Sequence, residues 1–206
     1  MSGLVDRVSL DVFLPFVMAG ARGLPESMAL AYIRQACIEF AQRSNILRRR
    51  AFIDMQCGVT DYPVWPDDCE EIARINAVRV GLTTYRGTRD TIDLCHCGSR
   101  FTVRDGLLHL PTPPHGDQPR AVEVRFCAKP AQTACEVDAI LHSDWQDAIE
   151  DGALARIYQL PGYEFTQPML ATTRARSFYE KIARARVRAL KSDTSATPFA
   201  VAPSFI

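Results

Sequence analysis

Hydrophobic and polar positions follow the periodicity of an α-helix in the first part of this 206-residue chain. Pro25 suits the first turn of a helix, where its missing N–H costs nothing. Arg48, Arg49 and Arg50 suit a helix C-terminus, where positive charge complements the helix dipole. A nucleic-acid patch is the alternative interpretation of this triplet. We therefore predict a helix that ends near residue 50, with this apolar stripe on one face: Leu30, Ile33, Cys37, Phe40 and Ala41.

The middle of the chain, residues 51–138, changes to the two-residue period of strands. Residues 122–126 alternate Val or Phe with a charged side chain, which predicts a half-buried strand. Asp105 and Gly106 separate two strand-like runs, and this dipeptide favours a two-residue hairpin turn. Residues 52–57 and 75–82 are further strand candidates. We predict a β-module of about six short strands, in which frequent prolines exclude long helices.

The helical period returns after residue 139. Ser143 and Gln146 have the spacing of a capping box, and Leu160-Pro161-Gly162 ends the helix that would follow. A second helix, roughly 35 Å long, is predicted from Pro168 to Lys191. Small residues in its apolar stripe favour close packing against another helix. The stripe consists of Ala171, Ala175, Phe178, Ile182, Ala185 and Ala189.

These rhythms predict an α+β fold. A helical bundle would be formed by the N- and C-terminal segments, with an inserted β-module and an extended C-terminal tail. The predicted parts are residues 1–50 (helical), 51–138 (β-module), 139–191 (helical) and 192–206 (tail). The tail has no period, yet it carries Phe199, Val201, Phe205 and Ile206. Such side chains favour ordering on a partner.

Composition narrows the function classes. The 24 basic and 24 acidic side chains cancel, so a general nucleic-acid coat is disfavoured and any polyanion contact must be local. The seven cysteines are odd in number and irregularly spaced, which indicates reduced, mostly buried thiols. Residues 12–21 imitate a signal peptide, but the basic segment that should precede them is absent. No apolar run approaches the roughly 20 residues of a transmembrane helix.

Three segments carry a likeness to a known family. They are Ile33–Phe40 followed by Arg43-Ser44, then Asp61–Ile72, and then Trp145–Arg188. In this order and spacing, over most of residues 25–190, the chain resembles the head–tail adaptor (connector) proteins of tailed bacteriophages. The family's motifs are structural, and Cys95–Cys97 matches none of them.

The resemblance implies a virion protein without catalytic activity. Such adaptors form a homo-oligomeric ring, typically a dodecamer, beneath the portal, and continue the DNA channel toward the tail. The implied partners are the portal protein, a downstream tail or nozzle protein, further copies of the chain and the genomic DNA, but no membrane. The implied locations are the virion neck and, during assembly, the host cytoplasm. A tail-completion ring protein is the nearest alternative. The tail residues Phe199, Val201, Phe205 and Ile206 would dock on the portal or a neighbouring subunit.

The last predicted helix is strongly basic, with Glu180 as its single acid after residue 168. One interpretation is contact with DNA or an acidic partner. The other is a solvated face with its last arginines favoured by the helix dipole. A small nucleic-acid-binding regulatory protein that uses this helix is the alternative function. The candidate contacts are Arg174, Arg176, Lys181, Arg184, Arg186 and Arg188, with Lys191 beside them.

Metal and catalytic chemistry find little support. Cys95-His96-Cys97, with His109 and His115, offers zinc-ligand types, but only one residue separates the cysteines, where structural zinc sites usually have two to four. Buried thiols are therefore the preferred interpretation. No phosphate loop, nucleophile elbow or metalloprotease motif is present. The acids Asp144, Asp147, Glu150 and Asp151 begin a predicted helix, where they complement its dipole. We predict no enzyme activity, cofactor or metal.

Overall fold

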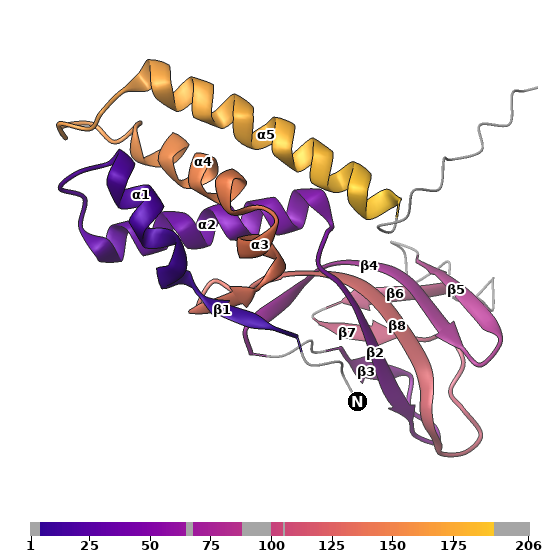
Figure 1. Ribbon diagram of the computed structural model, residues 1–206. Helices are drawn as coiled ribbons and strands as arrows, with labels where there is room; N and C mark the ends of the chain where they lie inside the picture. The colour runs from indigo at the N-terminus through magenta and orange to yellow at the C-terminus, as the bar shows by residue number, and fades with distance from the viewer. Residues whose placement is uncertain (1–4, 65–67, 88–99, 105, 192–206) are drawn as a thin grey trace, which may run out of the picture.

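The computed structural model describes residues 5–64, 68–87, 100–104 and 106–191, and it has a mixed α/β architecture. Figure 1 shows the helices gathered in one part of the molecule and the large sheet in the other. The helical elements are η1 (Leu10–Phe13), α1 (Leu14–Gly20), α2 (Glu26–Ser44), α3 (Ile140–Ser143), α4 (Gln146–Ile157) and α5 (Pro168–Leu190). The strands are β1 (Arg7–Ser9), β2 (Arg48–Met55), β3 (Asp61–Pro63), β4 (Glu70–Val80), β5 (Thr83–Gly87), β6 (Arg100–Arg104), β7 (Leu107–His109), β8 (Gln118–Pro130) and β9 (Glu136–Asp138).

Seven strands form one nearly closed sheet in the order β2-β8-β4-β5-β6-β7-β3. The long strand β8 pairs antiparallel with β2 on one side and with β4 on the other. Val122, Val124 and Phe126 of β8 are buried, whereas Arg125 is exposed on the opposite face. This alternation confirms the strand predicted from the two-residue period.

Helices from both sides of the sheet segment pack on one another. Helix α2 precedes the sheet, α4 and α5 follow it, and each of the three contacts the other two. Phe40 of α2 meets Trp145 and Phe178, with ring centroids 5.3 and 6.2 Å apart. The α5 stripe is buried as predicted at all positions except the half-buried Ala175. The predicted helix from Pro168 is confirmed to within one residue of its end.

The helices and the sheet share one core. Helix α2 also packs on β8, and the buried side chains of both regions belong to one continuous cluster. At the start of the chain, β1 pairs antiparallel with β9, so residues on either side of the large sheet are joined by a small two-stranded sheet. The first helices and the last ones are thereby held together at the same end of the molecule (Figure 1).

The predicted helix end at the arginine triplet is wrong. Helix α2 ends at Ser44, and Asn45 adopts the left-handed conformation with φ 56°. Its N–H donates to the Ala41 carbonyl oxygen at 3.0 Å, which closes the last turn. Asparagine tolerates this conformation better than most residues, so it ends the helix before the charges are reached. Arg48–Arg50 instead begin strand β2.

The predicted capping box at Ser143 is also wrong. Ser143 is the last residue of α3, and its hydroxyl donates to the Asp144 carboxylate at 2.9 Å. The start of α3 is marked by Asp138, whose carboxylate accepts from the Ile140 N–H at 2.9 Å. The hairpin prediction is confirmed, since β6 and β7 pair antiparallel and Gly106 has φ 78°. The predicted tail, residues 192–206, lies outside the described residues.

Candidate functional site

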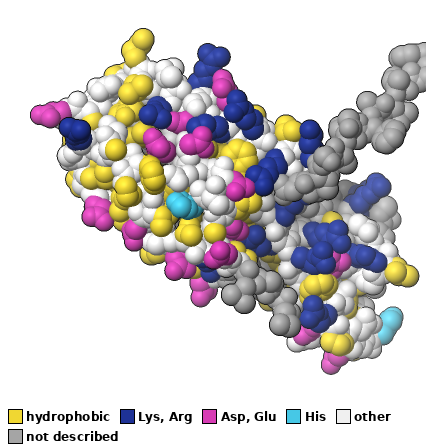
Figure 2. All heavy atoms as spheres, viewed as in Figure 1, with side chains coloured by type: hydrophobic (Ala, Val, Ile, Leu, Met, Phe, Trp, Pro, Cys, Tyr) yellow, Lys and Arg dark blue, Asp and Glu magenta, His cyan; other side chains and the backbone are white. Residues whose placement is uncertain are grey.

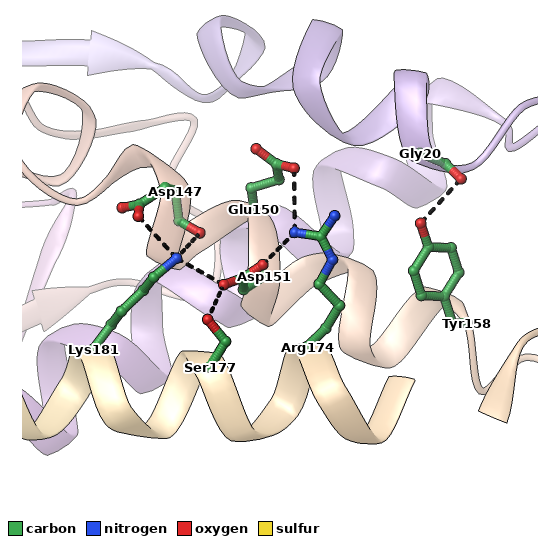
Figure 3. A network of polar contacts seen from close by, with 8 residues as sticks. All are labelled: Gly20, Asp147, Glu150, Asp151, Tyr158, Arg174, Ser177 and Lys181. Atoms are coloured by element: carbon green, nitrogen blue, oxygen red, sulfur yellow. Dashed lines mark hydrogen bonds and ion pairs between the residues drawn. The ribbon is translucent and has the colours of Figure 1, made fainter. Parts of the chain in front are cut away.

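The basic side chains on one face of α5 are neutralised within the chain. The carboxylate of Asp151 in α4 is buried and lies among three donors from α5 (Figure 3). It accepts from Arg174 Nη1 at 2.5 Å, from Ser177 Oγ at 2.6 Å and from Lys181 Nζ at 2.7 Å. Asp147 also pairs with Lys181 and Glu150 with Arg174. Asp147, Glu150 and Asp151 were predicted to complement a helix dipole, and in the structure they join α4 to α5.

The protonation of this network follows from its contacts. Burial by itself would raise the pKa of Asp151. The hydrogen bonds from Lys181, Ser177 and Arg174 lower this pKa by more than burial raises it, so the net shift is downward. Glu150 is less well paired, and burial raises its pKa. The Asp151 carboxylate is therefore ionised at neutral pH. The network holds two helices together and leaves Arg174 and Lys181 with their charges already paired.

The other predicted contacts on α5 differ in their surroundings. Arg188 pairs with Asp144 at 2.6 Å, and the exposed Arg176 pairs with Glu180 one turn along the helix at 3.1 Å. Arg184 is exposed. Arg186 is the member of the predicted set that lines a hollow between α5 and the sheet. The structure thus brings one of the six predicted side chains, Arg186, to this hollow.

A basic groove lies between the end of α5, the end of α2 and the outer face of strands β2, β8 and β4. Its volume is about 710 Å³. Figure 2 shows Lys and Arg side chains gathered over this part of the sheet. No carboxylate lines this hollow in the described part of the chain. Six arginines do: Arg48, Arg49, Arg50, Arg74, Arg125 and Arg186.

Strand register brings these arginines together from distant parts of the sequence. Arg50 of β2 lies directly opposite Arg125 of β8, so two like charges are cross-strand neighbours. One row further along, Arg48 and Arg74 flank Cys127 of β8 from the two sides. Cross-strand partners project from the same face of a sheet. The outer face therefore carries four arginines in two adjacent rows.

The charges in the groove are only partly balanced. Arg49 pairs with Glu70 and Asp138, each at 2.6 Å. Arg50 and Arg125 share one carboxylate, Glu123, at 3.3 and 2.8 Å. The hydrogen bond from Arg125, joined by the attraction of nearby arginines, lowers the pKa of Glu123. Among the described residues, no carboxylate lies within ion-pair distance of Arg74 or Arg186, and both are exposed.

Neutral polar groups add to the groove. The side chain of Ser44 is fully buried, lines the groove and has no hydrogen-bond partner in the described structure. Asn45 and Asn76 line it as well. A second hollow of about 540 Å³ shares Asn45, Arg74 and Arg186 with the first, so the two form a continuous surface along α5. Arg48 donates to the Ala189 carbonyl oxygen and so joins the groove to the end of α5.

Sequence reasoning did not bring these arginines together. Arg125 was expected only on the polar side of a strand, and for the triplet Arg48–Arg50 a helix end was preferred over the alternative of a nucleic-acid patch. Arg74 gave no signal by itself. The available signal was arginine at alternate positions of β2, but its meaning depends on which strands pair with β2. The β2–β8 and β4–β8 pairings join residues about 40 to 80 positions apart.

The remaining predicted sites lie elsewhere or outside the described residues. Cys95-His96-Cys97 and the tail residues Phe199, Val201, Phe205 and Ile206 fall outside them. His109 Nδ1 lies 2.6 Å from the Asp61 carboxylate, and His115 is exposed. Within the described ranges, no group of three or more His, Cys, Asp or Glu side chains could hold a metal ion. Cys37, Cys57, Cys69, Cys127 and Cys135 are free thiols.

Burial separates these thiols. Cys37 and Cys127 are buried, whereas Cys57 and Cys135 are exposed. Burial raises the pKa of the Cys37 thiol, which keeps it protonated. Cys127 accepts a hydrogen bond from Asn76 Nδ2 at 3.1 Å under the groove. The expectation of buried thiols therefore holds for part of the described set.

No protein-family model and no curated protein sequence matches this chain. In the part of the chain that the structure describes, no helix combines the length and apolar character needed to cross a membrane.

Proposed function

We propose that this chain is a head–tail adaptor of a tailed bacteriophage, a virion protein that forms a ring beneath the portal and continues the DNA channel toward the tail. A single observation carries the proposal. Helices from before and after the sheet segment, α2 on one side and α4 and α5 on the other, pack on one another around a shared core. The resemblance implies a helical bundle from both chain ends with an inserted β-module, and this packing supports that layout.

The energetics of α4 and α5 favour a structural role for the last helix. Asp151 and its three donors lie in the contact between the two helices and join them. A regulatory protein that reads DNA with α5 would need Arg174, Lys181 and Arg188 available, yet each already pairs with an acid of the chain. The adaptor is therefore the better-supported function, with a tail-completion ring as its nearest alternative.

Ring formation would use contacts between successive copies. In a cyclic ring each subunit meets the next head to tail until the rotation closes. Residues 192–206 would order only on the assembled portal, since fixing a segment of about 15 residues costs roughly 1–2 kcal/mol of backbone entropy per residue. Burial of Phe199, Val201, Phe205 and Ile206 would offset this cost.

Electron microscopy of negatively stained particles tests the proposal. The purified chain is imaged alone and after mixing with the portal protein of the same phage. We expect a ring bound at one end of the portal. A chain that does not bind the portal but binds the end of assembled tails would be a tail-completion protein instead. A variant that lacks residues 193–206 should fold and lose portal binding. If this variant binds the portal as well as the full chain does, residues 193–206 do not contribute to portal binding.

A further inference from the structure

We infer that the basic groove between α5 and the outer face of β2, β8 and β4 binds the phosphate backbone of a nucleic acid. The adaptor proposal does not assign this surface. The inference depends on that proposal only for identifying the nucleic acid as the viral genome. Binding itself is a property of the single chain and can be measured without a portal.

The first step is that the excess of positive charge in the groove favours binding of an anion. Arg50 and Arg125 lie directly opposite each other on neighbouring strands, an arrangement that is unfavourable for like charges. Their one shared carboxylate, Glu123, cannot neutralise both. Arg74 and Arg186 have no carboxylate partner in the described structure. A bound anion would relieve the repulsion, and guanidinium groups match phosphate in charge and shape.

The second step is that the ligand is extended. The arginines come from three strands and one helix, and the surface continues into the second hollow, where Arg74 and Arg186 recur beside Arg43. A single small anion could contact only a few of them. A chain of phosphates could follow the whole surface along α5 and exchange its counterions for these guanidinium groups.

The third step favours nucleic acid over an acidic protein segment. Besides arginine, the polar lining consists of Ser44, Asn45 and Asn76, the side-chain types that join arginine in phosphate contacts. The buried Ser44 hydroxyl has no partner among the described residues and can donate a further hydrogen bond. An acidic peptide would need apolar pockets for its other side chains, whereas arginine and the neutral polar residues Ser44, Asn45 and Asn76 make up most of the lining of the first hollow. Because phosphate contacts carry no sequence information, the binding should be independent of base sequence.

The test compares two full-length double variants with equal changes of charge. Arg74→Glu with Arg186→Glu reverses the two unpaired arginines of the groove. Arg104→Glu with Arg184→Glu reverses one exposed strand arginine and one exposed α5 arginine that do not line it. Circular dichroism establishes that both variants are folded. Fluorescence anisotropy of a labelled random-sequence DNA duplex is then measured over a range of salt concentrations.

We expect the groove variant to bind at least about tenfold more weakly than the wild type, with the slope of log affinity against log salt reduced by about two. The control variant should stay within about twofold of the wild type. Equal weakening of both variants, or no measurable binding by the wild type at low salt, overturns the inference. Competition by polyglutamate that exceeds competition by unlabelled DNA at equal charge would assign the groove to an acidic protein segment and also overturn it.

The outcome is separable from that of the adaptor proposal. The groove variant is also imaged with the portal. If the wild-type chain forms a ring on the portal but does not bind DNA, the groove inference would be refuted and the adaptor proposal would stand. If the chain binds DNA through the groove but does not bind the portal, the groove inference would be supported and the adaptor proposal would be refuted.

Discussion

Gly152 occupies a position in α4 where only a hydrogen atom fits. A Cβ atom added there would lie 2.7 Å from Cε2 of Phe178, a side chain that is 2% exposed between α4 and α5. Alanine would gain about 1 kcal/mol of helix propensity. Overpacking a core usually costs about 1–3 kcal/mol, so the clash should outweigh the gain.

We therefore predict that Gly152→Ala lowers the free energy of unfolding by up to about 2 kcal/mol in urea denaturation. Gly116→Ala is the matched control, because a Cβ there meets nothing within 4 Å. A Gly152→Ala protein as stable as the wild type would mean that α4 and α5 can move apart at Phe178 without cost, contrary to their close packing at this point.

Asp151 is the residue whose protonation should control stability in acid. Its pKa is lowered, because the donors of α5 outweigh the effect of burial. A carboxyl group with a depressed pKa contributes stability that is present above its unfolded pKa, about 3.9, and is lost as pH falls through the folded value. The contribution should therefore be constant near neutrality and decline once the pH falls below about 4.

We predict that Asp151→Asn costs about 3 kcal/mol at pH 7, since it leaves Lys181 and Arg174 beside an amide. The difference from the wild type should shrink as pH falls below about 4. Urea denaturation at a series of pH values measures it. Glu180→Gln, which breaks an exposed pair on the same helix, should change stability by no more than about 0.5 kcal/mol. A difference for Asp151→Asn that persists at low pH would contradict the electrostatic explanation.

The sequence predicted single residues unevenly. The six basic contacts on α5 were chosen by charge alone, and charge alone cannot tell a paired side chain from an available one. Arg174 and Lys181 turned out to be paired with Asp151, whereas Arg186 lines the groove. Arg74 and Arg125 were not chosen, because their place in the groove arises from strand pairing and not from local spacing.

Among the elements, long periodic segments were predicted well and short ones were not. Helix α5 and strand β8 have 23 and 13 residues, enough for their periods to stand out. Strands β1 and β9 have three residues each and form only because they pair with each other. The end of α2 was misplaced because positive charge is a weaker stop signal than a residue that adopts the left-handed conformation.

The turn after α2 offers a test at this scale. Asn45 has φ 56° and joins α2 to the arginine-bearing start of β2. Asn45→Gly should preserve stability to within a few tenths of a kcal/mol, because glycine adopts this conformation freely. Asn45→Val should cost about 1–3 kcal/mol through backbone strain. Thermal denaturation of both variants measures the difference. Equal stability of the two would show that the turn can adopt another conformation.

For the whole molecule, the mixed α/β class was predictable and the sheet topology was not. Periods of hydrophobic residues identify helices and strands, but they do not say which strands are neighbours. The order β2-β8-β4-β5-β6-β7-β3 places β3 at the far edge from β2 and pairs β5 parallel with β6. These pairings are decided by packing across the closed core, and the candidate groove depends on them.

The shared core has a consequence for how the molecule unfolds. Buried side chains of α2, α4 and α5 are continuous with those of β8 and β4, so the helices and the sheet should lose their structure together. In hydrogen-exchange mass spectrometry, peptides from β8 and from α5 should report the same highest opening free energy. Gly152→Ala lies among the helices, yet it should lower protection in β8 as much as in α5. Protection lost in α5 alone would show that the sheet is an independent folding unit, inserted into the helices but not energetically coupled to them.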